Sequence, residues 1–172
     1  MTQVRKRIHR EIRASPGIHF NELVRTLDLA PGQVQYHIKQ LISTGSIIPE
    51  SAWGRTHYYP SGIDSEDRRA IAVVRRETSE ALLKTLIETD PCSPMDLADD
   101  LDIARSTLEY HLDRMVEVGL VEKVHGLGGE VTVSIVDPDR AELLLSLVEP
   151  TTVDRLSDRF ERLLDQVIER NQ

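Results

Sequence analysis

Apolar residues recur at helical spacing in the first third of the chain, beginning with Val4, Ile8 and Ile12. Residues one turn apart share a face of a helix, so this spacing predicts an amphipathic helix that ends near Pro16. Two more helical stretches follow, the second of which begins at Pro31 and closes at a glycine. Two β-rich runs then flank the turn SAWGR and predict a two-stranded hairpin. The second and third helices are predicted over about 20–28 and about 31–44.

The segment QVQYHIKQL, residues 33–41, has a near copy in TLEYHLDRM, which lies 74 residues later. Shifting the chain by 74 residues aligns about thirty positions without a gap. Two copies are too few for a repeat solenoid, so the chain is predicted to hold two homologous domains. The second copy should contain the same elements, with helices near 78–89, 94–101 and 105–118 and a hairpin made by VEKV and EVTVSI. Identical pairs include Leu23 with Leu97, Leu27 with Leu101, Tyr36 with Tyr110, His37 with His111, and Gly45 with Gly119.

The net charge of −8 conceals a strong asymmetry between the two halves. Residues 1–62 hold eight Lys/Arg and four Asp/Glu, whereas residues 63–172 hold 13 Lys/Arg and 25 Asp/Glu. This division suggests that the first half meets a polyanion and that the second does not. The 17 arginines against four lysines, together with the many carboxylates, resemble the composition of proteins from salt-accumulating archaea.

Helix, helix-turn-helix and β-hairpin is the element order of a winged helix-turn-helix domain. In NELVRTLDLAPGQVQYHIKQLISTG with GRTHYYP, and in MDLADDLDIARSTLEYHLDRMVEVGLVEK, the sequence resembles the tandem winged helix-turn-helix transcriptional regulators of archaea, within the MarR/ArsR-like group. The resemblance covers about residues 3–136 and implies sequence-specific binding of double-stranded DNA. We expect a mainly α fold with small β-hairpin wings, divided into a DNA-binding domain at 1–62, a linker helix at 63–77, a second winged domain at 78–136 and C-terminal helices at 137–172.

The third predicted helix would lie in the major groove, with its N-terminal residues nearest the bases. A projection at 100° per residue places its polar residues opposite Val34, Ile38 and Leu41. Side-chain amides match adenine, a lysine can neutralise a phosphate, and an arginine near the tip of the wing suits the DNA backbone or the minor groove. The predicted DNA contacts are Gly32, Gln33, Tyr36, Lys39, Gln40 and Ser43 from the helix, and Arg55, Thr56 and His57 from the wing.

His37 lies at the margin of the apolar face of this helix. Nothing nearby supplies further metal ligands, so we interpret it as a structural histidine that holds a backbone carbonyl or packs against the neighbouring helix. The basic residues of the first helix either follow the phosphate backbone or form an ordinary solvated face. They are Arg5, Lys6, Arg7, Arg10 and Arg13.

The second copy differs from the first at the positions that would face DNA. Asp113 stands where the first copy has Lys39, and carboxylates that face a phosphate backbone repel it. We therefore expect an auxiliary or regulatory role for this domain, or a second and weaker DNA contact. Its candidate DNA contacts are Arg105, Ser106, Thr107, Tyr110 and Arg114.

The joint between the copies predicts a nearly continuous helix from about 66 to 89, which would fix the spacing of the domains. Beyond Pro150, a predicted helix at the end of the chain carries an apolar stripe. Such a helix behind a finished domain more often pairs with another copy than with its own domain, so we expect a homodimer that reads palindromic half-sites. The stripe consists of Val153, Leu156, Phe160, Leu163, Leu164 and Val167.

Other functional classes find little support in the sequence. A phosphate-binding glycine loop, an HExxH motif and a recognisable nucleophile–base pair are lacking, and Cys92 alone cannot build a thiolate metal site. No apolar run approaches the roughly 20 residues needed to span a bilayer. We therefore expect a cytoplasmic DNA-binding protein without catalytic activity, cofactor or metal. Two alternatives stay open: a winged-helix scaffold for protein assembly that does not read DNA, and a regulator switched by a small-molecule effector.

Overall fold

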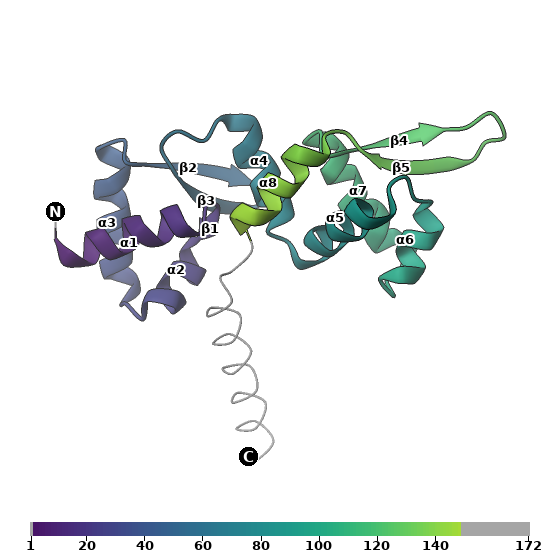
Figure 1. Ribbon diagram of the computed structural model, residues 1–172. Helices are drawn as coiled ribbons and strands as arrows, with labels where there is room; N and C mark the ends of the chain where they lie inside the picture. The colour runs from purple at the N-terminus through teal and green to yellow at the C-terminus, as the bar shows by residue number, and fades with distance from the viewer. Residues whose placement is uncertain (1, 149–172) are drawn as a thin grey trace, which may run out of the picture.

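The computed structural model describes residues 2–148 of the chain. Two lobes lie end to end in an elongated molecule and are joined by a central helix, α4 (Figure 1). The fold is mainly α with two small β-hairpins, as predicted. The helices are α1 (Gln3–Ala14), α2 (Phe20–Leu27), α3 (Pro31–Ser43), α4 (Ser65–Val74), α5 (Glu77–Thr89), α6 (Pro94–Asp100), α7 (Arg105–Glu117) and α8 (Pro138–Val148), and the strands are β1 (Ile18–His19), β2 (Ile47–Ala52), β3 (Arg55–Pro60), β4 (Val121–His125) and β5 (Val131–Ile135).

In the first lobe, α1, α2 and α3 close around one apolar core. Their inward residues follow the predicted helical spacing, and Ile8, Ile12, Leu23, Val34 and Leu41 are fully buried. The predicted hairpin is present as β2 and β3, which pair antiparallel. A third strand that was not predicted, the two-residue β1, adds to the far edge of β3 and gives the sheet order β1-β3-β2. Two residues are too few to show a period of two in the sequence.

The second lobe repeats the backbone of the first. Its helices α5, α6 and α7 and its hairpin β4–β5 occur where the shift of 74 residues predicts them. Residues with positive φ angles also occupy equivalent positions in the two copies. Asp28 and Asp102 have φ angles of 48° and 49°, and Gly45 and Gly119 have φ angles of 67° and 69°. All four lie in the left-handed region, which few residues adopt without strain. The two copies therefore share turn geometry as well as helix positions.

The nearly continuous helix predicted from about 66 to 89 is instead two helices with a bend between them. The chain leaves the helix after Val74, and Arg76 is extended with φ −83° and ψ 126° before α5 begins. The bend lets the buried faces of both helices meet in one core, where Ile71 and Val74 lie with Leu82 and Leu86. A straight helix would carry these residues apart, and the burial of their apolar surface favours the bend.

α4 is a core helix and not merely a connector. Five consecutive residues, Ala70 to Val74, are buried, so every side of the C-terminal half of α4 is covered. Tyr59 of β3 shares the core that α4 forms with the second lobe, and its hydroxyl donates a hydrogen bond to the carbonyl of Arg68 at 2.7 Å. The two lobes are thus packed on a common element.

α8 covers the other side of this joint. Leu144, Leu145 and Val148 are buried in the core that α4 and α5 share, so the first part of the predicted C-terminal segment packs on its own chain. Within residues 2–148, no helix is long and apolar enough to cross a membrane. The predicted dimerisation residues Val153, Leu156, Phe160, Leu163, Leu164 and Val167 lie outside the described residues.

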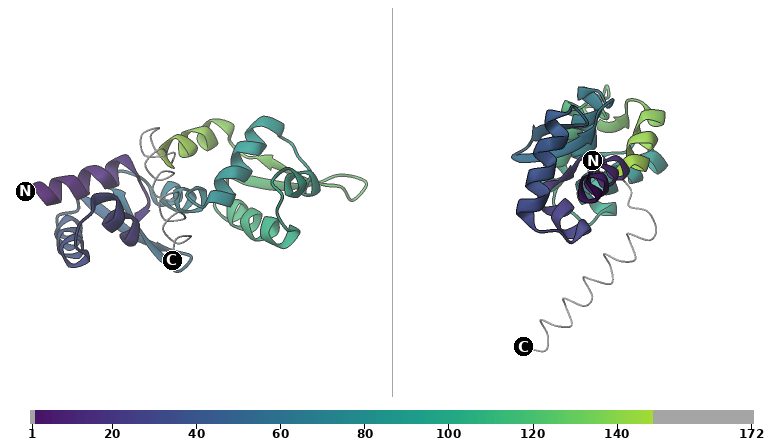
Figure 2. Two further views of the ribbon diagram at one scale, coloured as in Figure 1. Left: turned by 90° about the horizontal axis from the view of Figure 1, so that it is seen from below. Right: turned by 90° about the vertical axis from the view of Figure 1, so that its left-hand side faces the viewer.

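The elements divide between two sides of the molecule. Seen from below, α3, the β2–β3 hairpin and α7 lie along one side, whereas α1 and α8 lie along the other (Figure 2). The third helices of both lobes therefore share a side, with the first hairpin between them.

Candidate nucleic-acid interface

The outer face of α3 is exposed as predicted. Tyr36 is 57% exposed, and the side chains of Gln33, Lys39 and Ser43 are also exposed, whereas Gln40 is partly covered. α3 contains no Asp or Glu, so nothing on the helix itself repels a phosphate. Gly32 is exposed near the start of the helix, and a Cβ built on it would meet no atom within 4 Å. The backbone of this first turn is therefore accessible to a ligand.

Two adjoining hollows extend this surface from α3 across β3 to α2. The first, about 400 Å³, is lined by Lys39 and its neighbours on α3 and by the strands. The second, about 740 Å³, carries two guanidinium groups, those of Arg25 and Arg55. Phe20, Thr56 and Tyr58 line both hollows. The larger hollow is lined by His19, Phe20, Asn21, Arg25, Arg55, Thr56 and Tyr58, a described set without a carboxylate.

Arg25 and Asn21 are the site residues that sequence analysis missed. Both are exposed on α2, and both line the hollow that Arg55 lines from β3. Thirty residues separate Arg25 from Arg55, so no local pattern connects them. Two arginines beside hydroxyl and amide groups suit a phosphate, because the guanidinium fork matches its oxygens.

His57 is not part of this surface, and its predicted DNA contact is wrong. The side chain is 6% exposed, and its Nδ1 lies 2.7 Å from the carbonyl oxygen of Gly17. A carbonyl only accepts, so Nδ1 carries the proton and donates. Side chains alternate along a strand, and Thr56 and Tyr58, which flank His57, line the hollows. His57 therefore points to the opposite face, toward the joint with α4.

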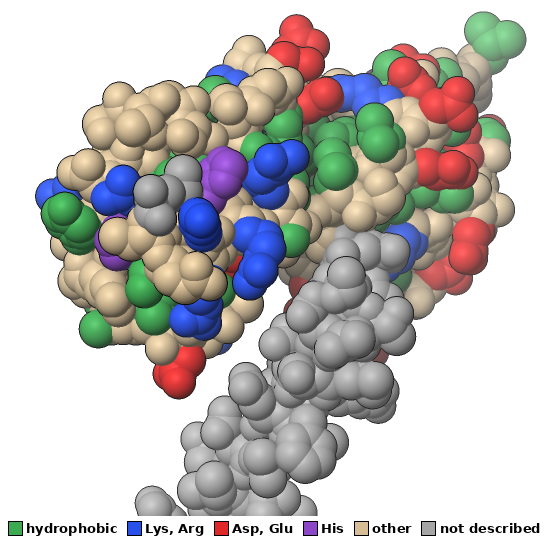
Figure 3. All heavy atoms as spheres, turned by 60° about the vertical axis from the view of Figure 1, so that its left-hand side comes forward, with side chains coloured by type: hydrophobic (Ala, Val, Ile, Leu, Met, Phe, Trp, Pro, Cys, Tyr) green, Lys and Arg blue, Asp and Glu red, His purple; other side chains and the backbone are tan. Residues whose placement is uncertain are grey.

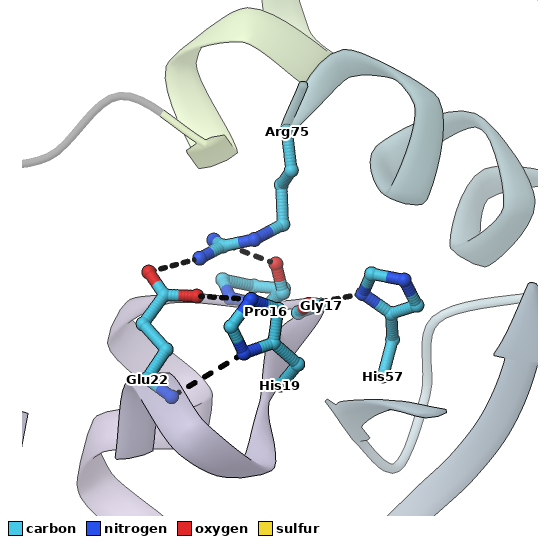
Figure 4. A network of polar contacts seen from close by, with 6 residues as sticks. All are labelled: Pro16, Gly17, His19, Glu22, His57 and Arg75. Atoms are coloured by element: carbon cyan, nitrogen blue, oxygen red, sulfur yellow. Dashed lines mark hydrogen bonds and ion pairs between the residues drawn. The ribbon is translucent and has the colours of Figure 1, made fainter. Parts of the chain in front are cut away.

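At that joint, Arg75 reaches from the end of α4 into the first lobe (Figure 4). Its guanidinium donates to Glu22 Oε1 at 2.7 Å and to the carbonyl of Pro16 at 3.4 Å. Glu22 lies in the first turn of α2, where its backbone N–H donates to Nδ1 of the capping residue His19 at 3.3 Å. The network ties α4 to the turn that precedes α2.

Both histidines of this network are held neutral at pH 7. Burial lowers the pKa of His57, and the positive charge of Arg75 lowers it further. Burial also lowers the pKa of His19, with contributions from Arg55 and Arg75, although Glu22 opposes them. His19 therefore presents an uncharged edge to the larger hollow, whose positive charge comes from arginine.

The paired histidines of the repeat are structural. His37 is 7% exposed and packs edge-on against the ring of Tyr36, with centroids 5.1 Å apart. The ring contact is with the adjacent residue of α3 and not with the neighbouring helix, so packing against that helix stays a prediction. The Nδ1 atom of His37 has no hydrogen-bond partner among the described residues, so the predicted carbonyl contact is not seen there. In the second copy, His111 Nδ1 lies 2.8 Å from Ser79 Oγ. Burial lowers the pKa of His111.

α7 presents a different surface. Arg105, Ser106, Thr107 and Tyr110 are exposed as predicted, but Arg114 is half-buried. Its guanidinium stacks 3.5 Å from the centroid of the Tyr110 ring and 5.7 Å from that of Trp53, at the tip of the first hairpin.

Carboxylates occupy the middle of α7. Lys123 of β4 donates to Glu109 at 2.7 Å and to Asp113 at 2.9 Å. The hydrogen bond that Lys123 donates to Glu109 is the main cause of the raised pKa of Lys123. The charge of Lys123 is thus neutralised by the two carboxylates of α7, and little positive charge is left for a polyanion.

The electrostatic surface follows the same division. In Figure 3, Lys and Arg side chains gather on the half of the molecule turned toward the viewer, whereas Asp and Glu concentrate on the far half. α3 and the larger hollow both belong to the first lobe, which is the basic half expected from residues 1–62.

Comparisons with solved structures found similar chains of low identity. An ArsR-like transcriptional regulator from Rhodococcus sp. RHA1 is 23% identical, with a TM-score of 0.41 over 61% of this chain and 92% of that one. A multiple antibiotic-resistance repressor (MarR) from Listeria monocytogenes 4b F2365 is 19% identical, with a TM-score of 0.40 over 85% and 90%. Reduced AbfR bound to DNA is 13% identical, with a TM-score of 0.38 over 80% and 93%. At these TM-scores the likenesses carry no argument about function.

Comparisons with sequence families are more direct. No curated protein matches the chain significantly. A family model described as an N-terminal HTH domain matches residues 2–71, and a second, described as a helix-turn-helix domain, matches residues 77–124. The first match covers α1 to the first part of α4 and includes β2–β3, and the second covers α5 to α7 and most of β4. Two helix-turn-helix matches, each on one lobe and each followed or completed by a β-hairpin, identify the chain as a tandem winged helix-turn-helix protein.

Proposed function

We propose that this protein is a sequence-specific double-stranded DNA-binding transcription regulator. α3 enters the major groove, where Gln33 and Gln40 offer amides to base edges and Lys39 neutralises a phosphate. Arg25 and Arg55 hold the DNA backbone beside the groove. The role is binding without catalysis, and the protein works in the cytoplasm.

One observation carries this proposal. The exposed face of α3, which lacks carboxylates, continues into a hollow with two arginines and no acidic residue among the described side chains that line it. Positive charge beside hydrogen-bonding side chains on an exposed helix is the arrangement that reads a base sequence between two phosphate backbones. The chain as a whole is acidic, with a net charge of −8, so the lack of carboxylates on this face needs a reason. DNA binding supplies one, whereas a winged-helix scaffold for protein assembly does not.

The second domain has an auxiliary role in this proposal. Its third helix carries Glu109 and Asp113, which engage Lys123 and would repel a phosphate backbone. The exposed residues at the start of α7, Arg105 and Thr107, leave room for a weaker contact with DNA.

The decisive experiment is selection of genomic fragments by the purified protein across a range of potassium chloride concentrations. We expect a shared motif that survives as salt rises, because base contacts depend less on counterion release than phosphate contacts do. Fragments without a common motif that are lost as salt rises would leave only non-specific attraction to the basic half. The scaffold function would then be preferred.

We further propose that the regulator is a homodimer that binds near-palindromic sites, held together by the apolar stripe after Pro150. α8 already packs on its own chain, so it is retained in the test. Sedimentation of the full chain and of a variant that ends at Val148 should give a dimer and a monomer, respectively. A truncated protein that is still a dimer would exclude the stripe as the interface.

A further inference from the structure

The first wing, the β2–β3 hairpin, carries a tryptophan at a turn position that bulky residues rarely occupy. Trp53 and Gly54 form a two-residue turn between the paired residues Ala52 and Arg55, with φ angles of 46° and 79°. Turns with two positive φ angles favour Asn and Gly, and a bulky residue there is strained. Trp53 instead packs against the core that α4 shares with the second lobe. The contact of its side chain accounts for a residue that the turn itself disfavours.

Arg114 of α7 contacts the ring of Trp53. Its guanidinium lies near two rings, 3.5 Å from the centroid of Tyr110 and 5.7 Å from that of Trp53. Planar guanidinium groups stack well on aromatic faces, and both distances are within the range of cation–π attraction. The Nε atom of Arg114 is buried and has no hydrogen-bond partner among the described residues. Its Nη1 donates one long hydrogen bond, 3.4 Å, to the carbonyl of Tyr110 within the same helix. The side chain is therefore placed toward the wing by its ring contacts, with a single polar contact inside α7.

The wing is also held along its length. Glu50 of β2 forms an ion pair with Arg68 of α4, and both side chains are largely buried, with 22% and 15% of their surface exposed. Tyr59 of β3 donates its hydroxyl to the carbonyl of Arg68. On the other side of α4, Arg69 pairs with Glu117 at the end of α7 at 2.5 Å. The hairpin is thus fixed near its base by α4 and at its tip by α7.

We propose that the second domain anchors the first wing, and that Arg114 is a positioning residue for DNA binding by the first domain and not itself a DNA contact. This inference rests on the proposed function. Arg55 and Thr56 follow the docked tip directly and line the larger hollow, so the stack holds them beside Arg25 before DNA arrives. Preorganisation of this kind removes part of the entropy lost when a mobile loop is ordered on binding.

The docked state can be measured without DNA because Trp53 is the only tryptophan in the chain. In Arg114→Ala, we expect the Trp53 emission to shift to longer wavelength and its quenching by acrylamide to increase. Arg114→Lys keeps the charge but loses the planar group, so it should resemble the alanine variant. Thr107→Ala changes an exposed residue of the same helix and should leave both signals as in the wild type. Unchanged emission in both Arg114 variants would overturn the docking.

The effect on DNA separates positioning from direct contact. The loss of a cation–π contact of about 1 kcal/mol corresponds to roughly fivefold weaker binding in Arg114→Ala. The dependence of affinity on salt should keep the wild-type slope, since no phosphate contact is removed. A slope reduced by about one with rescue by Arg114→Lys would show a direct phosphate contact and overturn the proposal. An affinity equal to that of the wild type would overturn it as well.

Failure of the proposed function gives a different result. If the wild-type chain selects no DNA motif, the assignment as a regulator fails, and so does the positioning role. The fluorescence of the Arg114 variants would still decide whether the second domain anchors the wing.

Discussion

At the scale of single residues, the joint between the lobes depends on Gly17. Its φ angle is +82°, and a Cβ built there would lie 2.8 Å from Ile71 Cγ2 and 2.9 Å from Arg75 Cδ. The missing side chain allows α4 to approach the turn after α1 closely enough for Arg75 to reach Glu22. Backbone angle and close packing both require glycine at this position.

Gly17→Ala should therefore destabilise the protein by about 2–4 kcal/mol, through the left-handed backbone and through overpacking. Gly45→Ala is the matched control, because its φ angle is +67° but no atom lies within 4 Å of the added Cβ. We expect that control to lose only about 1 kcal/mol, the backbone contribution alone. Urea unfolding of both variants measures the difference. Equal losses would mean that the contact with α4 relaxes without cost.

The buried histidines make stability depend on pH. The pKa of His57 is lowered by burial and by Arg75, with His19 and Arg76 adding to the effect. In this range the unfolded chain binds more protons than the folded one. The stability that comes from burying a neutral histidine is therefore fully present above the pKa of the unfolded chain, about 6.5. It is lost as the pH falls below that value.

We expect unfolding free energies to fall between about pH 7 and pH 5, by at most about 1.4 kcal/mol per pH unit for each such histidine. His57→Asn keeps a donor near the carbonyl of Gly17 but cannot titrate, so it should reduce this slope. The pKa values of His19 and His111 are also lowered, so these residues should preserve the remaining dependence of stability on pH. Urea titrations at a series of pH values provide the check, and an identical slope in the variant would refute the role of His57.

At the scale of elements, α3 and α7 show how one backbone supports two surfaces. Their inward residues coincide through the repeat, with Val34 and Leu41 buried in one lobe and Leu108 and Met115 in the other. The outward residues differ, because they contribute little to packing and are free to vary. Helix geometry is thus shared, whereas the electrostatic potential that a ligand meets is reversed by single substitutions such as lysine to aspartate.

Lys39→Ala tests the surface of α3. If the ammonium group neutralises one phosphate, its loss should weaken DNA binding several-fold and reduce the slope of affinity against salt by about one. Lys6→Ala removes another exposed lysine of the same lobe, on α1, which lies on the opposite side of the molecule (Figure 2). That control should bind as the wild type does. Similar losses in both variants would indicate diffuse attraction and not an oriented interface.

At the scale of the whole molecule, α4 couples the packing of the two domains. Its residues Ile71 and Val74 share a core with the second lobe, while Gly17 and Tyr59 of the first lobe pack against the same helix. Neither lobe can lose its structure without exposing apolar surface of the other. We therefore expect the sequence boundary at residue 62 to separate two copies of a repeat but not two units of stability.

Calorimetry should show one cooperative unfolding transition in which the calorimetric and van't Hoff enthalpies agree. Leu82→Ala, in the core of the second lobe, should shift that whole transition downward, with a loss of about 2–5 kcal/mol. Two separate transitions, of which only one responds to the substitution, would show that the lobes unfold independently.

The sequence by itself determined the helices and hairpins that the two copies share, the repeat and the outer face of α3. These features follow from local periodicity and from stop signals such as Pro31 and Gly45, which act within a few residues along the chain. The exposure of Tyr36 and the burial of Val34 are decided by helix geometry alone once the helix exists.

Only the tertiary structure decided which distant residues meet. It turned His57 away from the surface, because the pairing of β1 and the packing of α4 fix which face of β3 is covered. It brought Arg25 and Arg55 to the lining of one hollow and placed the Trp53 ring 5.7 Å from the guanidinium of Arg114, although the residues of each pair lie far apart in the chain. The bend before α5 has the same origin, since burial of apolar surface between lobes outweighs continuation of the helix. Non-local packing leaves no periodic trace in a sequence, and so the chain order alone could not reveal these contacts.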